Sequence, residues 1–292
     1  MEIQVPLILF TSFLAWSAGV FATQGVLLAR GKLRGCQMAV LGCAFATLVI
    51  GGVAVLFHLK QPLHIFNGFG NPTSGITQEL VAIVIMFVLM VVVFAYLRRN
   101  PDDKPVPAWA AVCVVIVSVA LDCVMAHSYM MPSRPVWDSV AQVLSLVGAS
   151  CLVGPATVEA IASAKGADDL GDLPRATKAA SAVGAVLTVL YLVVMSFASG
   201  SFIDMGYYFD PTHPTRNMFD PSTVSPFASG AVAGTAVAIV AAILSFAGAA
   251  VAPRKSRTAA AVCAVVLGLV ATIALRIVFY QLGYSAFNFY GL

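Results

Sequence analysis

The chain has 292 residues, of which 60% are hydrophobic and only 10% are charged, and its mean hydropathy is +0.93. Soluble domains carry about 25% charged residues, so this composition excludes an ordinary soluble enzyme and indicates an integral membrane protein. The net charge of +3 is small, and it gives no reason to expect nucleic acid as a partner.

Eight apolar runs in the sequence are long enough to cross ~30 Å of hydrocarbon as α-helices. They cover about Val5–Leu28, Cys36–Phe57, Glu79–Leu97, Pro107–Met125, Asp138–Ala164, Ala179–Gly200, Ala228–Val251 and Ala259–Leu282. A bilayer provides no water for unpaired peptide groups, so segments of this kind must be helical. We therefore predict an all-α bundle of eight transmembrane helices, which forms a single domain over residues 1–292 or divides into two four-helix halves, about 1–127 and 137–292.

The Lys and Arg residues between the predicted helices indicate how the bundle is oriented. Twelve of them follow the first, third, fifth and seventh helices, and three lie on the other side. The twelve are Arg30, Lys32, Arg34, Arg98, Arg99, Lys104, Lys165, Arg175, Lys178, Arg254, Lys255 and Arg257, and the three are Lys60, Arg134 and Arg216. Loops rich in Lys and Arg stay in the cytoplasm. We predict a multi-pass protein of the cytoplasmic membrane with both termini outside.

No residues in the sequence are spaced like the ligands of a haem, an iron–sulfur cluster or a metal ion. The six cysteines lie in apolar stretches, and no two are spaced as C-x-x-C, whereas clusters and zinc sites need grouped thiolates. None of the four histidines lies in the middle of a predicted helix, so no His pair is expected to face into the bundle. We predict that this chain itself holds no haem, no iron–sulfur cluster and no metal.

Polar and ionisable residues gather near the outer ends of the predicted helices. His58 closes the second helix, Glu79 opens the third and His127 closes the fourth. Asp122 lies about a turn from the outer end of the fourth helix, and Arg276 lies near the outer end of the eighth. Ionisable groups are costly in a membrane and face the protein interior, so we predict a polar pocket at the outer surface. The alternative is an Asp122–Arg276 ion pair that only fixes helix packing.

The segment around the second and third helices carries a motif. It reads His-Leu-Lys-Gln-Pro-Leu-His-Ile-Phe-Asn over residues 58–67, and a turn rich in Ser and Thr leads from there to Glu79. The pattern H-L-x-x-P-L-x-x-F-N, the turn and the Glu resemble the membrane anchor subunit of dimethyl sulfoxide reductase, within the wider group of polysulfide-reductase-type membrane subunits. The motif covers about Phe57–Leu80, and the eight-helix layout extends the resemblance over the whole chain.

This resemblance implies a membrane anchor for a molybdopterin catalytic subunit and a four-cluster iron–sulfur subunit, in a complex of anaerobic respiration. Such an anchor oxidises menaquinol and passes the electrons to the iron–sulfur subunit. The family often has Gly and Arg where this chain has Lys60 and His64, so a basic residue is kept at the second position. The candidate quinol-binding residues are His58, His64, Asn67, Glu79, Asp122, His127 and Arg276, and the candidate catalytic residues are His58 and Glu79.

The chemistry of quinol oxidation suits these residue types. The reaction removes two electrons and two protons, and an imidazole, which titrates near pH ~6.5, can accept a hydrogen bond from a quinol hydroxyl and then take its proton. A nearby carboxylate can orient the imidazole or relay the proton to water. Electrons cannot cross ~30 Å of hydrocarbon unaided, so we predict that the iron–sulfur subunit sits outside, against the loops Gln61–Gln78 and Ser201–Pro226.

Two other functions are compatible with the sequence. A transporter or proton channel would use Asp122, Glu159 and Arg276, but no polar residues bridge the midplane between Asp122 and Glu159. Glu159 also suits a purely structural role. A passive anchor would hold a partner without binding quinone, and it would not need the outer polar cluster.

Overall fold

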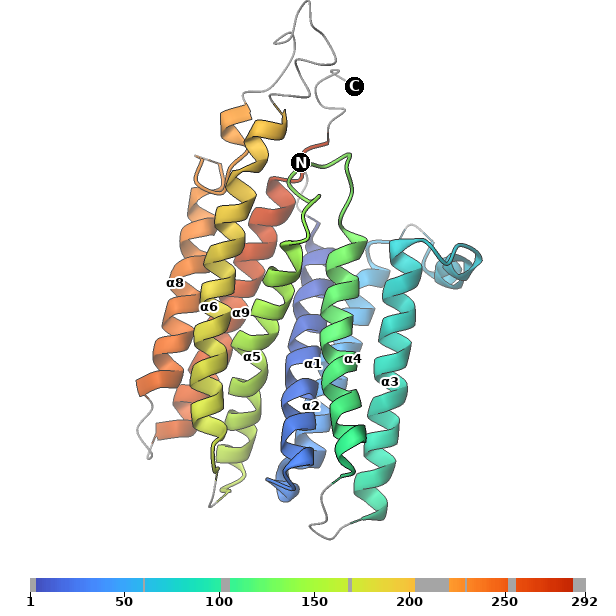
Figure 1. Cartoon of the computed structure of the whole chain (residues 1–292), viewed down its shortest axis with the longest axis vertical. Helices are drawn as coiled ribbons and strands as arrows, with labels where there is room; N and C mark the ends of the chain where they lie inside the picture. Colours follow the sequence, from blue (N-terminus) through green and yellow to red (C-terminus); the bar gives the residue numbers. More distant parts are fainter. Residues whose placement is uncertain are drawn as a thin grey trace, which may run out of the picture.

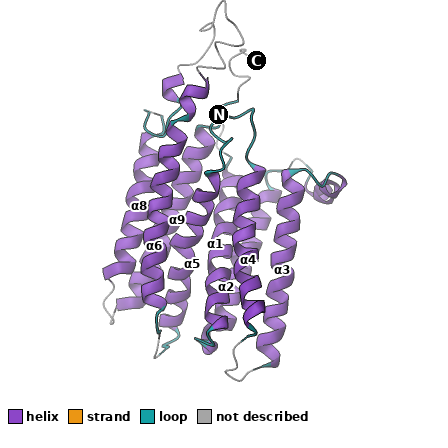
Figure 2. Cartoon of the chain, in the orientation of Figure 1, coloured by secondary structure: helices purple, strands orange, loops and turns teal. Residues whose placement is uncertain are grey.

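The fold is known from a computed structural model, which describes residues 4–59, 61–100, 106–167, 170–202, 221–228, 230–251 and 256–285. Within these residues the chain consists of helices and loops (Figure 2). The long helices are α1 (Val5–Ala29), α2 (Arg34–Leu56), α3 (Gly75–Arg99), α4 (Ala108–Ser128), α5 (Gln142–Ala164), α6 (Leu173–Ser196), α8 (Val232–Val251) and α9 (Arg257–Gln281), and the 3-10 helices are η1 (Pro62–Gly70) and η2 (Pro221–Thr223). Eight helices are long and apolar enough to span a membrane. The predicted all-α, eight-helix fold is confirmed.

Several helices begin at other residues than the apolar runs predict. α5 and α8 begin later, at Gln142 and Val232, and the largest shifts to an earlier start are those of α3 and α6. α3 begins at Gly75, so Glu79 lies one turn inside the helix. α6 begins at Leu173 because Pro174 occupies its first turn, a position where proline has no hydrogen bond to lose. The first turns of both helices are polar, and hydropathy alone does not distinguish such turns from loops.

The helices stand side by side in one bundle with α1 and α5 at its centre (Figure 1). α1 packs against α2, α4 and α5, whereas α5 packs against α1, α6 and α9. Figure 1 shows α1 to α4 on one side and α5, α6, α8 and α9 on the other. The contact between α1 and α5 therefore joins these two groups of helices.

Glycines bring the backbones of α1 and α5 into direct contact. A Cβ atom on Gly19 would lie 2.3 Å from the carbonyl oxygen of Ser150, and one on Gly154 would lie 2.3 Å from the carbonyl carbon of Gly19. Small residues of this kind let membrane helices approach closely. The Ser150 hydroxyl then donates a hydrogen bond of 2.7 Å to the Ala15 carbonyl, and Trp16 Nε1 donates one of 2.8 Å to Thr157 Oγ1.

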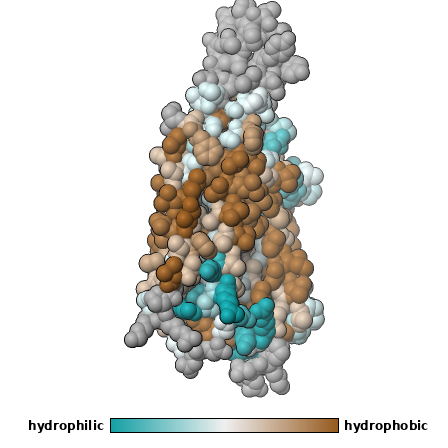
Figure 3. All heavy atoms as spheres, turned by 60° about the vertical axis from the view of Figure 1, so that its left-hand side comes forward, coloured by the Kyte–Doolittle hydropathy of each residue, from teal (hydrophilic) through white to brown (hydrophobic). Residues whose placement is uncertain are grey.

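The two ends of the bundle differ from its middle. On the face shown in Figure 3, hydrophobic atoms cover the middle of the bundle and hydrophilic atoms gather at the lower end of the view. We call the end at which α1 begins and α9 ends the terminal face, and the other end the opposite face (Figure 1). The helix ends joined by the α1–α2, α3–α4, α5–α6 and α8–α9 connections lie at the opposite face (Figure 1). Those of the twelve basic residues that the structure describes lie in these connections or at the adjoining helix ends.

Candidate functional site at the terminal face

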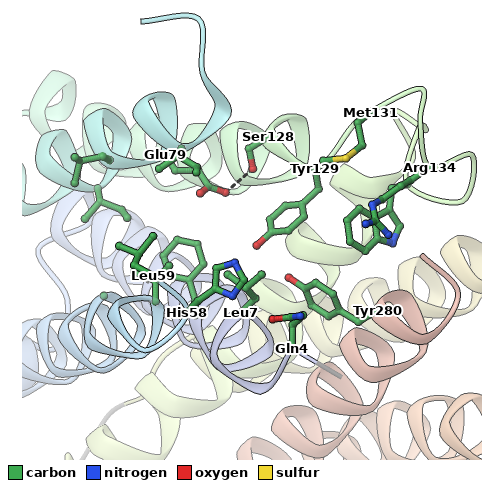
Figure 4. A pocket seen from close by; sticks show the side chains of 17 residues that line it. Gln4, Leu7, His58, Leu59, Glu79, Ser128, Tyr129, Met131, Arg134 and Tyr280 are labelled. Carbon is green, nitrogen blue, oxygen red and sulfur yellow. Dashed lines mark hydrogen bonds between the residues drawn. The ribbon is translucent and has the colours of Figure 1, made fainter. Parts of the chain in front are cut away.

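A pocket of about 460 Å³ opens between the terminal-face ends of α1, α2, α3, α4 and α9 (Figure 4). Its volume falls within the range of about 300–1,000 Å³ that is typical of small-molecule sites. Apolar side chains form most of its wall, and its polar or aromatic members are Gln4, Phe10, His58, Glu79, Ser128, Tyr129, Arg134, Trp137 and Tyr280. An apolar pocket with a few polar groups pointing inwards is the usual form of a ligand site.

His58 reaches the pocket from the end of α2. The helix ends at Leu56, but the His58 amide still donates a 3.0 Å hydrogen bond to the Val55 carbonyl, so the last turn continues through the histidine. Its imidazole points into the pocket beside Leu59 and is accessible to solvent (Figure 4). A proton taken up by this ring therefore has a route to water.

Glu79 reaches the same pocket from the first turns of α3. Its side chain is only 7% exposed, and one carboxylate oxygen accepts a hydrogen bond from the Ser128 hydroxyl at the end of α4 (Figure 4). Gly75 allows this contact, because a Cβ atom there would lie 2.8 Å from the Ser128 Cβ. The close approach of α3 to α4 thus holds the carboxylate at the wall of the pocket.

An aromatic cluster forms the wall next to α9. The Trp137 ring stacks on Phe279 with a centroid distance of 4.8 Å, and its Nε1 donates a hydrogen bond of 2.9 Å to the Phe279 carbonyl. Tyr129 meets Trp137, Phe279 and Tyr280 edge-on. Aromatic pairs prefer such stacked or edge-to-face geometries, so this wall is rigid enough to hold a flat ring in one orientation.

Arg134 places a positive charge at the rim of this wall. Its guanidinium lies 4.7 Å from the centre of the Trp137 ring and donates a hydrogen bond to the Gly283 carbonyl. Partial burial lowers the pKa of Arg134, but an arginine remains charged in proteins. The loop between α4 and α5 thus brings a cation to a pocket whose one carboxylate comes from α3.

The buried Tyr280 hydroxyl lies within reach of the Tyr129 hydroxyl, but it has no hydrogen bond of good geometry within the described part of the chain. The Tyr129 hydroxyl faces it across the pocket (Figure 4). Buried polar groups are nearly always hydrogen-bonded, and an unpaired one costs about 1–3 kcal/mol. A ligand with a hydroxyl or carbonyl oxygen would satisfy Tyr280.

Several residues that the sequence analysis assigns to quinol binding lie elsewhere. His127 is exposed and does not line the pocket, and Asn67 is exposed on η1. The backbone of His64 lies in η1, and its side chain is outside the described part of the structure. Of the candidate quinol-binding residues whose side chains are described, the pocket brings together His58 and Glu79.

Asp122 and Arg276 are both buried, but each binds a different serine of α5. Ser150 Oγ lies 2.6 Å from Asp122 Oδ2, so its one proton is shared between this oxygen and the Ala15 carbonyl. Arg276 Nη2 donates a hydrogen bond of 2.8 Å to Ser145 Oγ. Among the described side chains the two residues do not form the ion pair considered above. Asp122 lines a separate small cavity of about 120 Å³, so these residues connect α4 and α9 to α5 instead of facing the 460 Å³ pocket.

Glu159 lies near the opposite face, where its carboxylate is 3.9 Å from Arg257 Nε. This pairing joins α5 to the first residue of α9. Asp122 and Glu159 belong to different contacts at different depths, so the described residues give no continuous polar line for a transported ion.

Four residues of the pocket are not predicted as site residues from the sequence, namely Ser128, Tyr129, Trp137 and Tyr280. Arg134 is counted there only as a basic residue outside the helices. Tyr and Trp at a helix end are usually membrane-interface anchors, so their presence alone does not indicate a site. The available signal is their position. Tyr129, Arg134 and Trp137 follow the predicted fourth helix, Tyr280 lies in the last turn of the eighth, and both helices end on the same side as His58.

The described part of the chain holds no group of three or more His, Cys, Asp or Glu side chains that could bind a metal ion. No curated protein shows significant similarity to the chain. A protein family does match, however: the family described as DMSO reductase anchor subunit (DmsC) matches residues 1–282. This match covers nearly the whole chain, and the eight membrane-spanning helices agree with a role as an anchor. The chain therefore belongs to the DMSO reductase anchor subunit (DmsC) family.

Proposed function

We propose that the chain is the menaquinol-oxidising membrane anchor of a molybdenum-dependent reductase complex of the dimethyl sulfoxide reductase type. The observation that carries this proposal is the 460 Å³ pocket, in which a histidine from α2 and a carboxylate from α3 face the same space. A flat, mostly apolar quinol ring suits the aromatic wall, and its two hydroxyls suit the polar groups. A passive anchor would not need such a pocket.

His58 accepts a hydrogen bond from one quinol hydroxyl and takes its proton. The oxygen then carries negative charge, which Arg134 stabilises from the rim of the pocket. The second hydroxyl faces the Tyr280 hydroxyl and Glu79, and Glu79 relays the second proton towards water. Two electrons leave at the same time, so menaquinol becomes menaquinone with the loss of two protons.

The electrons pass to a four-cluster iron–sulfur subunit and from there to the molybdopterin catalytic subunit. The pocket opens at the terminal face, so the first cluster has to approach that face. A surface suited to docking lies beside it, because Phe66 and Phe69 of η1 are exposed and their rings stack 6.4 Å apart. Exposed aromatic residues are enriched in protein interfaces. The other predicted docking loop, 201–226, lies largely outside the described residues.

Cross-linking of the assembled complex tests this placement. We expect the iron–sulfur subunit to cross-link to cysteines introduced at Phe66 or Phe69 of η1. The matched control is a cysteine at Lys165, an exposed residue of the α5–α6 connection at the opposite face. Cross-links at Lys165 with none on η1 would overturn the placement.

The orientation in the membrane is a separate prediction. The excess of basic residues at the opposite face predicts that this face is cytoplasmic and that the terminal face is outside. A reporter fused after Leu292 should be active only if it works in the extracytoplasmic space, and a reporter fused in the α5–α6 connection should behave in the opposite way. A cytoplasmic C-terminus would contradict the orientation without affecting the pocket.

Glu79→Gln should slow quinol oxidation by about 100-fold or more, since a positioned group that transfers protons contributes about 10²–10⁴-fold. The variant keeps the shape and can still accept the Ser128 hydrogen bond, but it cannot take a proton. Wild-type activity should fall as acid protonates the carboxylate, and the variant should lose this dependence. Steady-state rates across pH measure both effects.

Asp172→Asn is the matched control for Glu79→Gln, because it removes an exposed carboxylate at the opposite face. It should leave both the rate and the pH profile unchanged. A wild-type pH profile in Glu79→Gln would remove the carboxylate from the mechanism.

A further inference from the structure

A second pocket lies between α2 and α3, at a greater depth than the first. It measures about 340 Å³, and only apolar side chains of these two helices line it. The rings of Phe45 on α2 and Phe87 on α3 both line it and lie close together, with centroids 6.1 Å apart. These residues are near the middle of their helices, and the rest of the pocket extends towards the opposite face, as far as Met38 and Phe94.

Both pockets border the line of contact between α2 and α3, which we call the α2–α3 seam. On α2, Gly52 lines the first pocket and Phe45 lines the second, and seven residues bring a side chain back to the same side of a helix. On α3, Ile83 lines the first pocket and Phe87 the second, and residues four apart are neighbours on one face. Both helices therefore turn the same face to both pockets.

The seam is loosely packed, because α2 and α3 pack against each other sparsely, whereas α1 and α2 pack closely. Two glycines of α2 widen it further. Both Gly42 and Gly52 have no atom within 4 Å of the place where a Cβ would stand, so neither is needed for close packing of helices. Their positions leave room along the seam for another molecule.

The length of the seam indicates what occupies it. From His58 to Met38 the chain of α2 covers ~30 Å, which is the thickness of the hydrocarbon core. A phospholipid acyl chain extends through only one leaflet, whereas the polyisoprenoid tail of a quinol is long enough to pass the midplane. Its head group would lie in the first pocket and its far end in the second.

We propose that the α2–α3 seam is the binding site for the polyisoprenoid tail of the quinol, from the pocket at His58 to the groove lined by Phe45, Phe87 and Phe94. This inference rests on the proposed quinol oxidation and deepens it. The tail gains no hydrophobic energy by leaving lipid that is equally apolar, so van der Waals packing against the rings is what holds it. The seam therefore selects quinols by tail length and fixes the direction from which the head enters the pocket.

Gly42→Phe tests the inference in the assembled complex, because the new ring would fill the second pocket. We expect the KM for long-tailed menaquinol to rise about three- to tenfold, an effect that corresponds to the loss of part of the tail packing. The KM for an analogue with a single isoprene unit should not change, since that tail ends within the first pocket. Val240→Phe on the exposed side of α8 is the control, and it should change neither value.

The tail site would be overturned if Gly42→Phe left the KM of each quinol at its wild-type value. That result would leave the proposed function intact as long as the short-tailed analogue is still oxidised and His58→Ala still abolishes that oxidation. If neither quinol is oxidised by the wild-type complex, the proposed function itself fails.

Photolabelling of the wild-type complex does not depend on a variant that folds. A quinone with a photoreactive group at the far end of its tail should label peptides from residues 38–45 and 87–94, and long-tailed menaquinol should compete for that label. Labelling elsewhere in the chain, or competition by phospholipid alone, would assign the groove to lipid.

Discussion

His58→Ala is expected to lower quinol-dependent reduction by the assembled complex about 100-fold or more. The imidazole lines the pocket and is the base that we assign to the first quinol proton, and a positioned general base contributes about 10²–10⁴-fold. The side chain is accessible to solvent, so its removal should not disturb helix packing. Turnover with a quinol donor, measured together with the subunit content of the purified complex, separates loss of chemistry from loss of assembly.

Two further variants sharpen this result. Phe57→Ala is the matched control, since Phe57 is the neighbouring residue, is 80% exposed and does not line the pocket; it should keep the wild-type rate. His58→Gln retains a hydrogen-bonding side chain that cannot take a proton, so its KM should stay closer to the wild-type value while its kcat remains low. Unchanged quinol oxidation in His58→Ala would refute the role of this histidine.

Gly19→Ala should destabilise the bundle by about 1–3 kcal/mol, the usual cost of forcing extra carbon atoms into a packed interior. The added methyl group would overlap the Ser150 carbonyl, which belongs to a backbone that cannot rotate away. α1 would have to move from α5, and the hydrogen bond from Ser150 to Ala15 would lengthen. Thermal unfolding of the purified complex in detergent measures the loss.

Gly35→Ala provides the comparison for Gly19→Ala, because it adds the same methyl group to α2 where no atom lies within 4 Å. It should not lower the unfolding temperature, since alanine favours a helix over glycine. α1 also supplies Leu7 and Phe10 to the wall of the first pocket. Because Gly19→Ala would move α1, the variant should weaken quinol binding as well. Equal unfolding temperatures for the two variants would contradict the tight contact between α1 and α5.

The motif around His58 was the part of the site that the sequence could predict. His58 and Glu79 are separated by only one connection between adjacent helices, so the sequence places both at the same end of the bundle. The eight membrane spans were predictable for a similar reason, since a bilayer requires ~20 apolar residues in each spanning helix. Several helix starts differed from the predicted runs. Those of α3 and α6 were earlier than predicted, because polar first turns do not stand out in hydropathy.

The depth of a residue in the membrane can be read from the sequence, but the direction of its side chain within the bundle cannot. Asp122 and Arg276 share the depth of the outer cluster, yet each turns to a serine of α5. His127 is next to Ser128 in the chain, yet only Ser128 lines the pocket. One step along a helix rotates a side chain by about 100°, so depth alone does not decide which residues meet.

The aromatic wall of the first pocket and the second pocket between α2 and α3 also depend on tertiary packing. Trp137 and Phe279 stack although 142 residues separate them, and nothing in their sequence context pairs α9 with the α4–α5 loop. The sequence by itself determined the class of protein, the number of spans and the two residues of the local motif, because these depend on composition, length and nearby positions. The shape of the pocket depends on which helices are neighbours, and in a bundle that choice is made by contacts such as Gly19 against Gly154, between residues far apart in the chain.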